Sequence, residues 1–227
     1  MLVLILTAAA GAWTCALALN RLDDAKGYRV ALAGAAVYLL SAGLISRLCL
    51  LLSPIPLAAF AVYPHLKRST FLSFLGIGVA NALGPAGAWV AVRSAGGSPV
   101  LEDAGAVALL AGFCVLWAGA SDLIQGAPDD PPGVKAELRS LPGPADRHDA
   151  LWVSGAMQLL AAACLALLYS REFAGPWPLL GFAAVCVALI WEHENKGCDR
   201  ALFFKVNATV GFLVLAFIGA GVLIPEP

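Results

Sequence analysis

The sequence is short of charge. Asp, Glu, Lys and Arg make up 13% of its 227 residues, while 60% are apolar; a soluble domain has about 25% charged residues. Its 14 basic and 15 acidic residues leave a net charge of −1, so there is no basic surplus of the kind that binds nucleic acid. The composition predicts an integral membrane protein with no nucleic-acid partner.

The sequence also lacks cysteine motifs. Its six cysteines are widely spaced, with no CxxC pair and no Cys/His spacing of a metal site. They are Cys15, Cys49, Cys114, Cys164, Cys186 and Cys198. We interpret them as packing residues, because most lie inside apolar runs.

Long apolar runs are abundant and approach the roughly 20 residues that cross a bilayer. No basic residue precedes the first run, so we interpret it as a transmembrane helix and not as a signal peptide. The expected spans are 2–19, 30–46, 48–64, 71–92, 104–121, 150–169, 176–191 and 204–223. The fold class is therefore all-α: a polytopic transmembrane helical bundle of about eight helices, forming one domain over residues 1–227. Between the second and third spans we expect a turn near Ser46–Arg47, and a kink at Pro54 and Pro56.

The basic residues are concentrated in every second loop between the expected spans. Eleven lie in the loops 20–29, 65–70, 122–149 and 192–205, and three, Arg47, Arg93 and Arg171, lie on the opposite side. The positive-inside rule then places the first set of loops in the cytoplasm and both termini outside. Glu192 and Glu194 are assigned to the last of these loops, which leaves the helix interiors essentially free of charge. An ion or proton path through the bilayer is therefore not expected, and any chemistry belongs at the cytoplasmic mouth.

Acidic clusters follow two of the expected spans. Asn20 and Asp24 are four residues apart and would share a helical face, although taken alone such a pair is more often a solvated helix end. Asp122 and Asp129 are seven apart, so a continued helix would align them, but Pro128 and the following prolines oppose that continuation. Hard oxygen ligands of this kind could hold Mg²⁺ against a diphosphate.

A basic pair lies between the two acidic clusters in the sequence. Lys67 and Arg68 follow Tyr63 by a few residues and suit a phosphoryl group. We expect His65, His148 and His193 in surface loops, and Asn207 is a candidate substrate contact near the start of the last helix. Glycines at 76, 78, 84 and 87 are expected to permit close helix packing.

Five ordered motifs carry a specific resemblance. The segment Tyr63-Pro64-x-x-Lys67-Arg68-x-Thr70, followed by Gly84-Pro85-x-Gly87-Ala88-Trp89, is similar to a stretch of the UbiA-type membrane prenyltransferases, which attach polyprenyl chains to aromatic rings. The remaining matches are Asn20-Arg21-x-x-Asp24, Asp122-x6-Asp129, Ser140-Leu141-Pro142, and Trp191-Glu192-His193 with Phe203-Phe204-x-Val206-Asn207. The first and last of these most resemble the 4-hydroxybenzoate and futalosine-pathway menaquinone branches.

The resemblance implies a site and a reaction. Mg²⁺ would be held by Asn20, Asp24, Asp122 and Asp129, with Asp24 and Asp122 as catalytic residues. Arg21, Tyr63, Lys67 and Arg68 would bind the diphosphate of a polyprenyl donor, and a small aromatic acid would accept the chain in menaquinone or ubiquinone biosynthesis. The resemblance also implies an integral protein of a bacterial inner (plasma) membrane, in contact with membrane lipid and with its active face in the cytoplasm.

Departures from the family pattern support a second hypothesis. Tyr28 and Gly133 stand where the family's two motifs have further aspartates, and the loop after the first motif is short. Family members have nine helices, so this chain is also expected to lack the first. The alternative to an active prenyltransferase is therefore a catalytically impaired member that binds prenyl lipid or acts as a membrane assembly partner.

Overall fold

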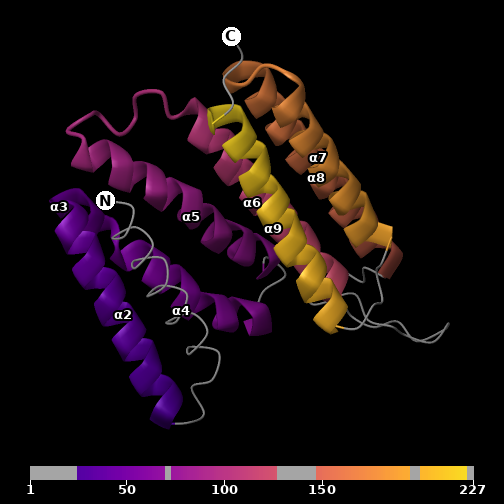
Figure 1. The fold of residues 1–227 in the computed structure, drawn as a ribbon. Helices are drawn as coiled ribbons and strands as arrows, with labels where there is room; N and C mark the ends of the chain where they lie inside the picture. The colour runs from indigo at the N-terminus through magenta and orange to yellow at the C-terminus, as the bar shows by residue number, and fades with distance from the viewer. Residues whose placement is uncertain (1–24, 70–72, 127–146, 195–199, 224–227) are drawn as a thin grey trace.

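The computed structural model describes residues 25–69, 73–126, 147–194 and 200–223, and these residues are helical apart from short connections (Figure 1). They form seven helices of 16 residues or more and the six-residue α3. The helices are α2 (Ala25–Ile45), α3 (Arg47–Leu52), α4 (Pro54–Ser69), α5 (Ser73–Ala95), α6 (Gly105–Gly126), α7 (Arg147–Glu172), α8 (Pro176–Glu194) and α9 (Arg200–Leu223). The prediction of an all-α bundle is confirmed.

The break between α2 and α3 lies at the expected turn. Ser46 is extended, with φ −163° and ψ 160°, and its hydroxyl accepts a hydrogen bond of 3.0 Å from the Cys49 amide, which caps α3. Helix α3 ends at Leu52, and Pro54 begins α4, because proline suits the first turn of a helix but not its interior. The expected kink is thus a full break between two helices.

The expectation of about eight spans is only partly met. Within the described residues, five helices, α5 to α9, are long and apolar enough to cross a membrane. Among the described residues, the expected spans 30–46 and 48–64 correspond to shorter apolar segments, Arg29–Ile45 and Arg47–Ala59. The expected span 2–19 lies outside the described residues.

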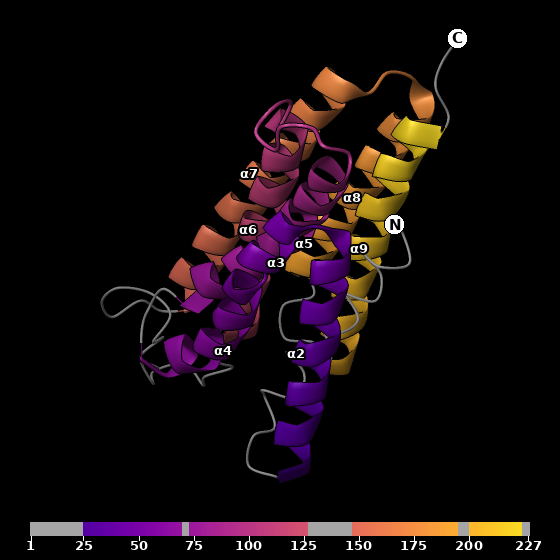
Figure 2. The same ribbon diagram turned by 90° about the vertical axis from the view of Figure 1, so that its left-hand side faces the viewer.

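Successive long helices run in opposite directions, so their ends gather at two ends of the bundle (Figures 1 and 2). We call the lower end in Figure 1 the motif end: it holds the last turns of α4, α6 and α8 and the first turns of α5, α7 and α9. The far end holds the connections at residues 46, 96–104 and 173–175. The alternation used to sort the charges therefore agrees with the fold.

Helix α6 lies at the centre of the packing. It contacts α5 and α7 most extensively, and Phe113 joins a buried core with Leu165 of α7, Val185 of α8 and Phe217 of α9. Because lipid is as apolar as these side chains, close van der Waals packing holds such helices together. The core thus holds helices α6 to α9 together.

Close helix approach depends on particular glycines. A Cβ on Gly78 would lie 2.4 Å from the Val115 carbonyl oxygen, and one on Gly119 would lie 3.1 Å from the Phe74 carbonyl oxygen. The packing role expected for Gly78 is confirmed. Among the described residues, a Cβ on Gly84 or Gly87 would meet no atom within 4 Å, so the packing role expected for these two glycines is not seen there. These two glycines lie on faces of α5 that no described helix approaches closely.

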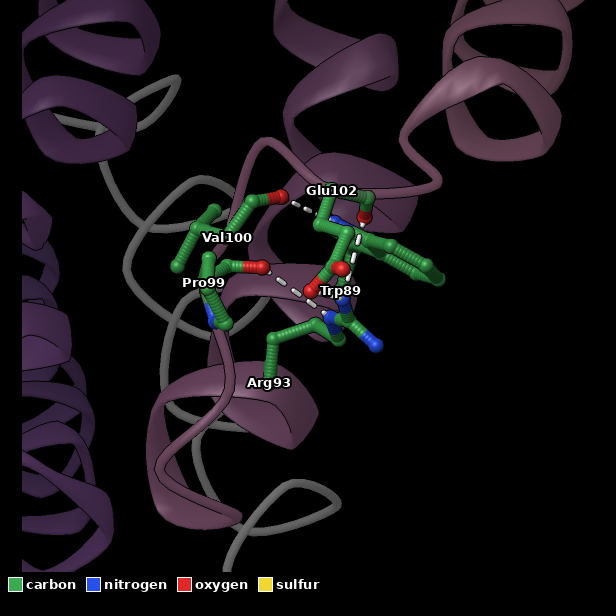
Figure 3. Close-up of polar contacts among 5 residues, drawn as sticks. All are labelled: Trp89, Arg93, Pro99, Val100 and Glu102. Atoms are coloured by element: carbon green, nitrogen blue, oxygen red, sulfur yellow. Dashed lines mark hydrogen bonds and ion pairs between the residues drawn. The ribbon is translucent and has the colours of Figure 1, made fainter.

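The far end is held by a cluster around Arg93 (Figure 3). Its guanidinium donates to the Pro99 and Glu102 carbonyl oxygens, forms a 3.2 Å ion pair with the Glu102 carboxylate, and lies 5.3 Å from the Trp89 ring centroid. The Trp89 indole donates to the Val100 carbonyl oxygen at 2.8 Å. These contacts fasten the α5–α6 connection to α5, at the opposite end from the predicted site.

Candidate active site at the motif end

Asp122 is the predicted site residue whose side chain the structure describes. It lies one turn before the end of α6 and is 9% exposed. Tyr63, Lys67 and Arg68 belong to the last two turns of α4, at the same end of the bundle, although only their backbone is described. Asn20, Arg21, Asp24 and Asp129 lie outside the described residues. The fold therefore gathers the basic motif of α4 and the aspartate of α6 at one end.

Glu192 is a buried acidic residue that the charge sorting misplaced. It lies inside α8, which continues to Glu194, and it is fully buried at 0% exposure. The assignment of Glu192 to a loop was therefore wrong: it belongs to the last turn of α8, and its side chain is buried. The error arose because a charged residue at the end of an apolar run resembles a loop residue in a hydropathy pattern.

The Glu192 carboxylate is bound by two side chains of α6. The Trp117 indole donates to its Oε2 at 3.1 Å, and the Ser121 hydroxyl donates to its Oε1. Trp117 and Ser121 are four residues apart and so project from the same face of α6. Two successive turns of α6 are thus joined to one residue of α8.

Asn207 of α9 extends this network. Its Oδ1 lies 3.4 Å from the Ser121 hydroxyl oxygen. Because the single Ser121 proton is used by Glu192, the contact is best made with the amide turned, so that its NH₂ group donates to the hydroxyl. Asn207 therefore contacts Ser121 across the helix interface, while the substrate contact expected for it stays a prediction.

Buried polar groups continue onto α7. A Cβ on Gly119 would meet Met157, and one on Gly112 would meet Cys164, so the antiparallel register places Asp122 at the level of Ser154. In the part of the chain that the structure describes, Ser154 Oγ and Gln158 Nε2 are buried and have no hydrogen-bond partner. Polar side chains inside membrane-spanning helices are costly and usually functional. A polar layer therefore crosses α6 to α9 near the motif end.

All three histidines lie in helices and not in the expected loops. His148 is in the first turn of α7, where its Nε2 accepts from the Trp152 indole at 3.0 Å. His193 is half-buried on α8, and a Cβ on Gly155 would lie 3.5 Å from its ring. Both line a groove of about 670 Å³ between α7 and α8. The third, His65, belongs to α4, and its side chain is not described.

The chemistry of the predicted donor set fits Mg²⁺. Asn20, Asp24, Asp122 and Asp129 offer only oxygen ligands, which Mg²⁺ prefers, and they include neither thiol nor imidazole. Among the described side chains, no three His, Cys, Asp or Glu groups converge as a metal site. Asp122 is therefore the described anchor of a site that would need the other three residues.

Comparisons with known proteins agree with this geometry. The model of the UbiA prenyltransferase family matches residues 16–209. The 4-hydroxybenzoate octaprenyltransferases of three strains of Xanthomonas oryzae pv. oryzae (PXO99A, MAFF 311018 and KACC10331 / KXO85) are 34% identical to this chain over 168 residues, which covers 71% of this chain and 52% of each relative. The chain thus spans about half the length of these curated relatives.

A solved structure shares the fold. The apo structure of a UbiA homolog from Aeropyrum pernix K1 superposes with a TM-score of 0.76, covering 98% of this chain and 88% of that one at 23% identity. At that identity the likeness concerns the arrangement of the helices. Since the family model matches most of the sequence and the motifs gather at one end of the bundle, the chain belongs to the UbiA prenyltransferase family.

Proposed function

We propose that this chain transfers a polyprenyl chain from its diphosphate to a small aromatic acid, as a Mg²⁺-dependent step of quinone biosynthesis. The observation that carries the proposal is the common location of two motifs. The basic motif of α4 and Asp122 of α6 lie at the same end of the bundle, although they are more than 50 residues apart in the sequence. The acceptor is suggested by the relatives, which are named as 4-hydroxybenzoate octaprenyltransferases.

In this proposal, the residues of the motif end have different roles at the diphosphate. Lys67 and Arg68 would neutralise its oxygens, Arg68 through its fork and Lys67 as a point charge, with Arg21 and Tyr63 as further contacts. Asn20, Asp24, Asp122 and Asp129 would hold Mg²⁺, which when bound neutralises the charge of the leaving diphosphate. Stabilising that developing charge would lower the barrier to breaking the allylic C–O bond.

The reaction balances without a further reactant. The allylic carbon loses its bond to the diphosphate oxygen and gains a bond to a ring carbon of the acceptor, and that ring carbon then loses its proton. The apolar tail of the donor would lie among the membrane-spanning helices α5 to α9, which are rich in exposed apolar side chains. We place the protein in a bacterial plasma membrane with the motif end in the cytoplasm, because the loops at that end carry most of the Lys and Arg residues.

A second candidate function is binding of prenyl lipid without turnover. Tyr28 and Gly133, where the family motifs have aspartates, favour it. An incomplete ligand set would hold Mg²⁺ more loosely, so that a donor could bind without being ionised.

Prenyl transfer in isolated membranes separates the two functions. Membranes containing the chain are supplied with a radiolabelled polyprenyl diphosphate, 4-hydroxybenzoate and a series of Mg²⁺ concentrations. The proposal predicts a labelled prenylated acid whose yield rises with Mg²⁺ and is lost in Asp122→Ala. Mg²⁺-dependent donor binding without any product would favour the binding function, and neither binding nor product would refute both.

A further inference from the structure

We infer that Glu192 is a positioning residue, which fixes the last turns of α6 through Trp117 and Ser121 and thereby sets the direction of Asp122. The inference rests on the proposed function, in which Asp122 is a ligand at the diphosphate site. Glu192 itself is fully buried among helices and is not offered as a ligand.

The contacts restrain α6 at two levels. Each Glu192 oxygen accepts one hydrogen bond, from Trp117 at one turn and from Ser121 at the next. Hydrogen bonds are directional, so this pair resists both rotation of α6 about its axis and sliding along α8. Apolar packing alone would permit such small movements, because dispersion contacts have little directional preference.

Asp122 inherits this restraint because it follows Ser121 directly. Successive residues of an α-helix project about 100° apart, from 3.6 residues per turn. With Ser121 held against α8, Asp122 projects from a different face of α6, at the level of Ser154 on α7. A turn of α6 that released Ser121 would move the Asp122 carboxylate by the same angle.

The described contacts between α6 and α7 are less directional. There α6 presents Gly119 to the flexible end of Met157, a contact that can adapt to a small rotation. The Ser154 hydroxyl on that side makes no hydrogen bond within the described residues. The polar link between Glu192 and α6 therefore provides the directional part of the packing.

A glutamine at position 192 would preserve the geometry. Its oxygen could accept from Trp117, and its amide could donate to the Ser121 hydroxyl, whose proton would then be available to Asn207 Oδ1. A leucine would fill similar space but would accept no hydrogen bond. The Trp117 indole would then be buried without its acceptor, and Ser121 would keep only its contact with Asn207. Comparing the two substitutions therefore shows whether the hydrogen-bond geometry at residue 192 or its negative charge is required.

The test measures Mg²⁺ binding without relying on turnover. The full-length chain is purified in detergent, inorganic diphosphate is held at a saturating concentration, and Mg²⁺ is titrated while the midpoint of thermal unfolding is recorded. A ligand that binds only the folded state raises this midpoint, and the titration gives the Mg²⁺ concentration for half of the rise. We expect Glu192→Leu to need about tenfold more Mg²⁺, as is typical when a residue that orients a metal ligand is lost.

Three further variants keep the test decisive. Glu192→Gln should titrate like the unmodified chain. Trp117→Phe, which loses one indole donor at the motif end, should need more Mg²⁺, whereas Trp89→Phe, which loses the matching donor to Val100 at the far end, should not. This second pair decides the matter if Glu192→Leu fails to fold.

The outcomes distinguish two failures. If the unmodified chain shows no Mg²⁺-dependent rise with diphosphate, the proposed function fails and the inference fails with it. If the unmodified chain responds and Glu192→Leu or Trp117→Phe responds at the same Mg²⁺ concentration, only the positioning role is refuted. A loss in Glu192→Gln as large as that in Glu192→Leu would also refute it, because the charge of Glu192 would then be required.

Discussion

Replacing Gly78 by alanine should weaken the packing of α5 against α6. The new Cβ would lie 2.4 Å from the Val115 carbonyl oxygen, well below the 3.0 Å that real Cβ contacts require, so the helices must separate by about 0.6 Å. The obstacle is backbone and cannot rotate away, so we expect a cost near 3 kcal/mol, the upper part of the usual range of about 1–3 kcal/mol for overpacking. For a chain of this size that lowers the unfolding midpoint by about 6–12 °C.

Gly84→Ala provides the matched control on the same helix. Its Cβ would meet nothing within 4 Å, so the midpoint should stay within about 2 °C of that of the unmodified chain. Thermal unfolding of the two purified variants in one detergent is the assay. Equal midpoints for Gly78→Ala and Gly84→Ala would refute the argument that close approach at Gly78 holds α5 to α6.

Three further predictions follow from the core, the motifs and the charge sorting. Phe217→Ala should lower the free energy of unfolding by about 3–5 kcal/mol, because its ring is fully buried among α6 to α9; a loss below 1 kcal/mol, measured by denaturant titration, would contradict this packing. The combined change Tyr28→Asp and Gly133→Asp should raise prenyl transfer at low Mg²⁺ by restoring two carboxylates, and unchanged transfer would show that they are not ligands. In a cysteine-free chain in intact cells, an impermeant thiol reagent should label a cysteine placed at position 101, which is exposed at the far end, but not one placed at 129; the reverse pattern would invert the proposed orientation.

Much of the fold could be predicted because its signals are local. Apolar runs mark the long helices, and the polar break at Ser46 and the prolines at 54 and 56 mark the interruption that the structure shows as α3 and α4. The number of spans agrees less well. The described residues contain five full spans, where the hydropathy pattern of the whole sequence suggested more.

The candidate site was predictable where residue type and helix end coincide. Asp122 and the basic motif of α4 are polar groups at the ends of apolar runs, and the alternation of helix direction brings such ends together. Glu192 could not be assigned in this way, because its hydrogen-bond partners Trp117 and Ser121 are more than 70 residues away in the sequence. The Trp191-Glu192-His193 motif and the i, i+4 spacing of Trp117 and Ser121 were the available signals.

The glycines also show that tertiary contacts cannot be predicted from a local sequence pattern. Gly78 and Gly84 lie on one helix and look alike in the sequence, yet one faces the α6 backbone and the other faces open space. Which face of α5 meets α6 is a tertiary property. It depends on contacts with residues of α6 and α7, and no local pattern in α5 records it.

The most direct test of the central claim locates the metal. Crystals of the chain would be grown with Mn²⁺ in place of Mg²⁺ and with a non-hydrolysable polyprenyl thiodiphosphate, and an anomalous difference map would show the bound ion. The account predicts a peak at the motif end within ligating distance of an Asp122 oxygen, close to the last turns of α4. A peak at the far end, or a bound diphosphate analogue with no metal near Asp122, would contradict it.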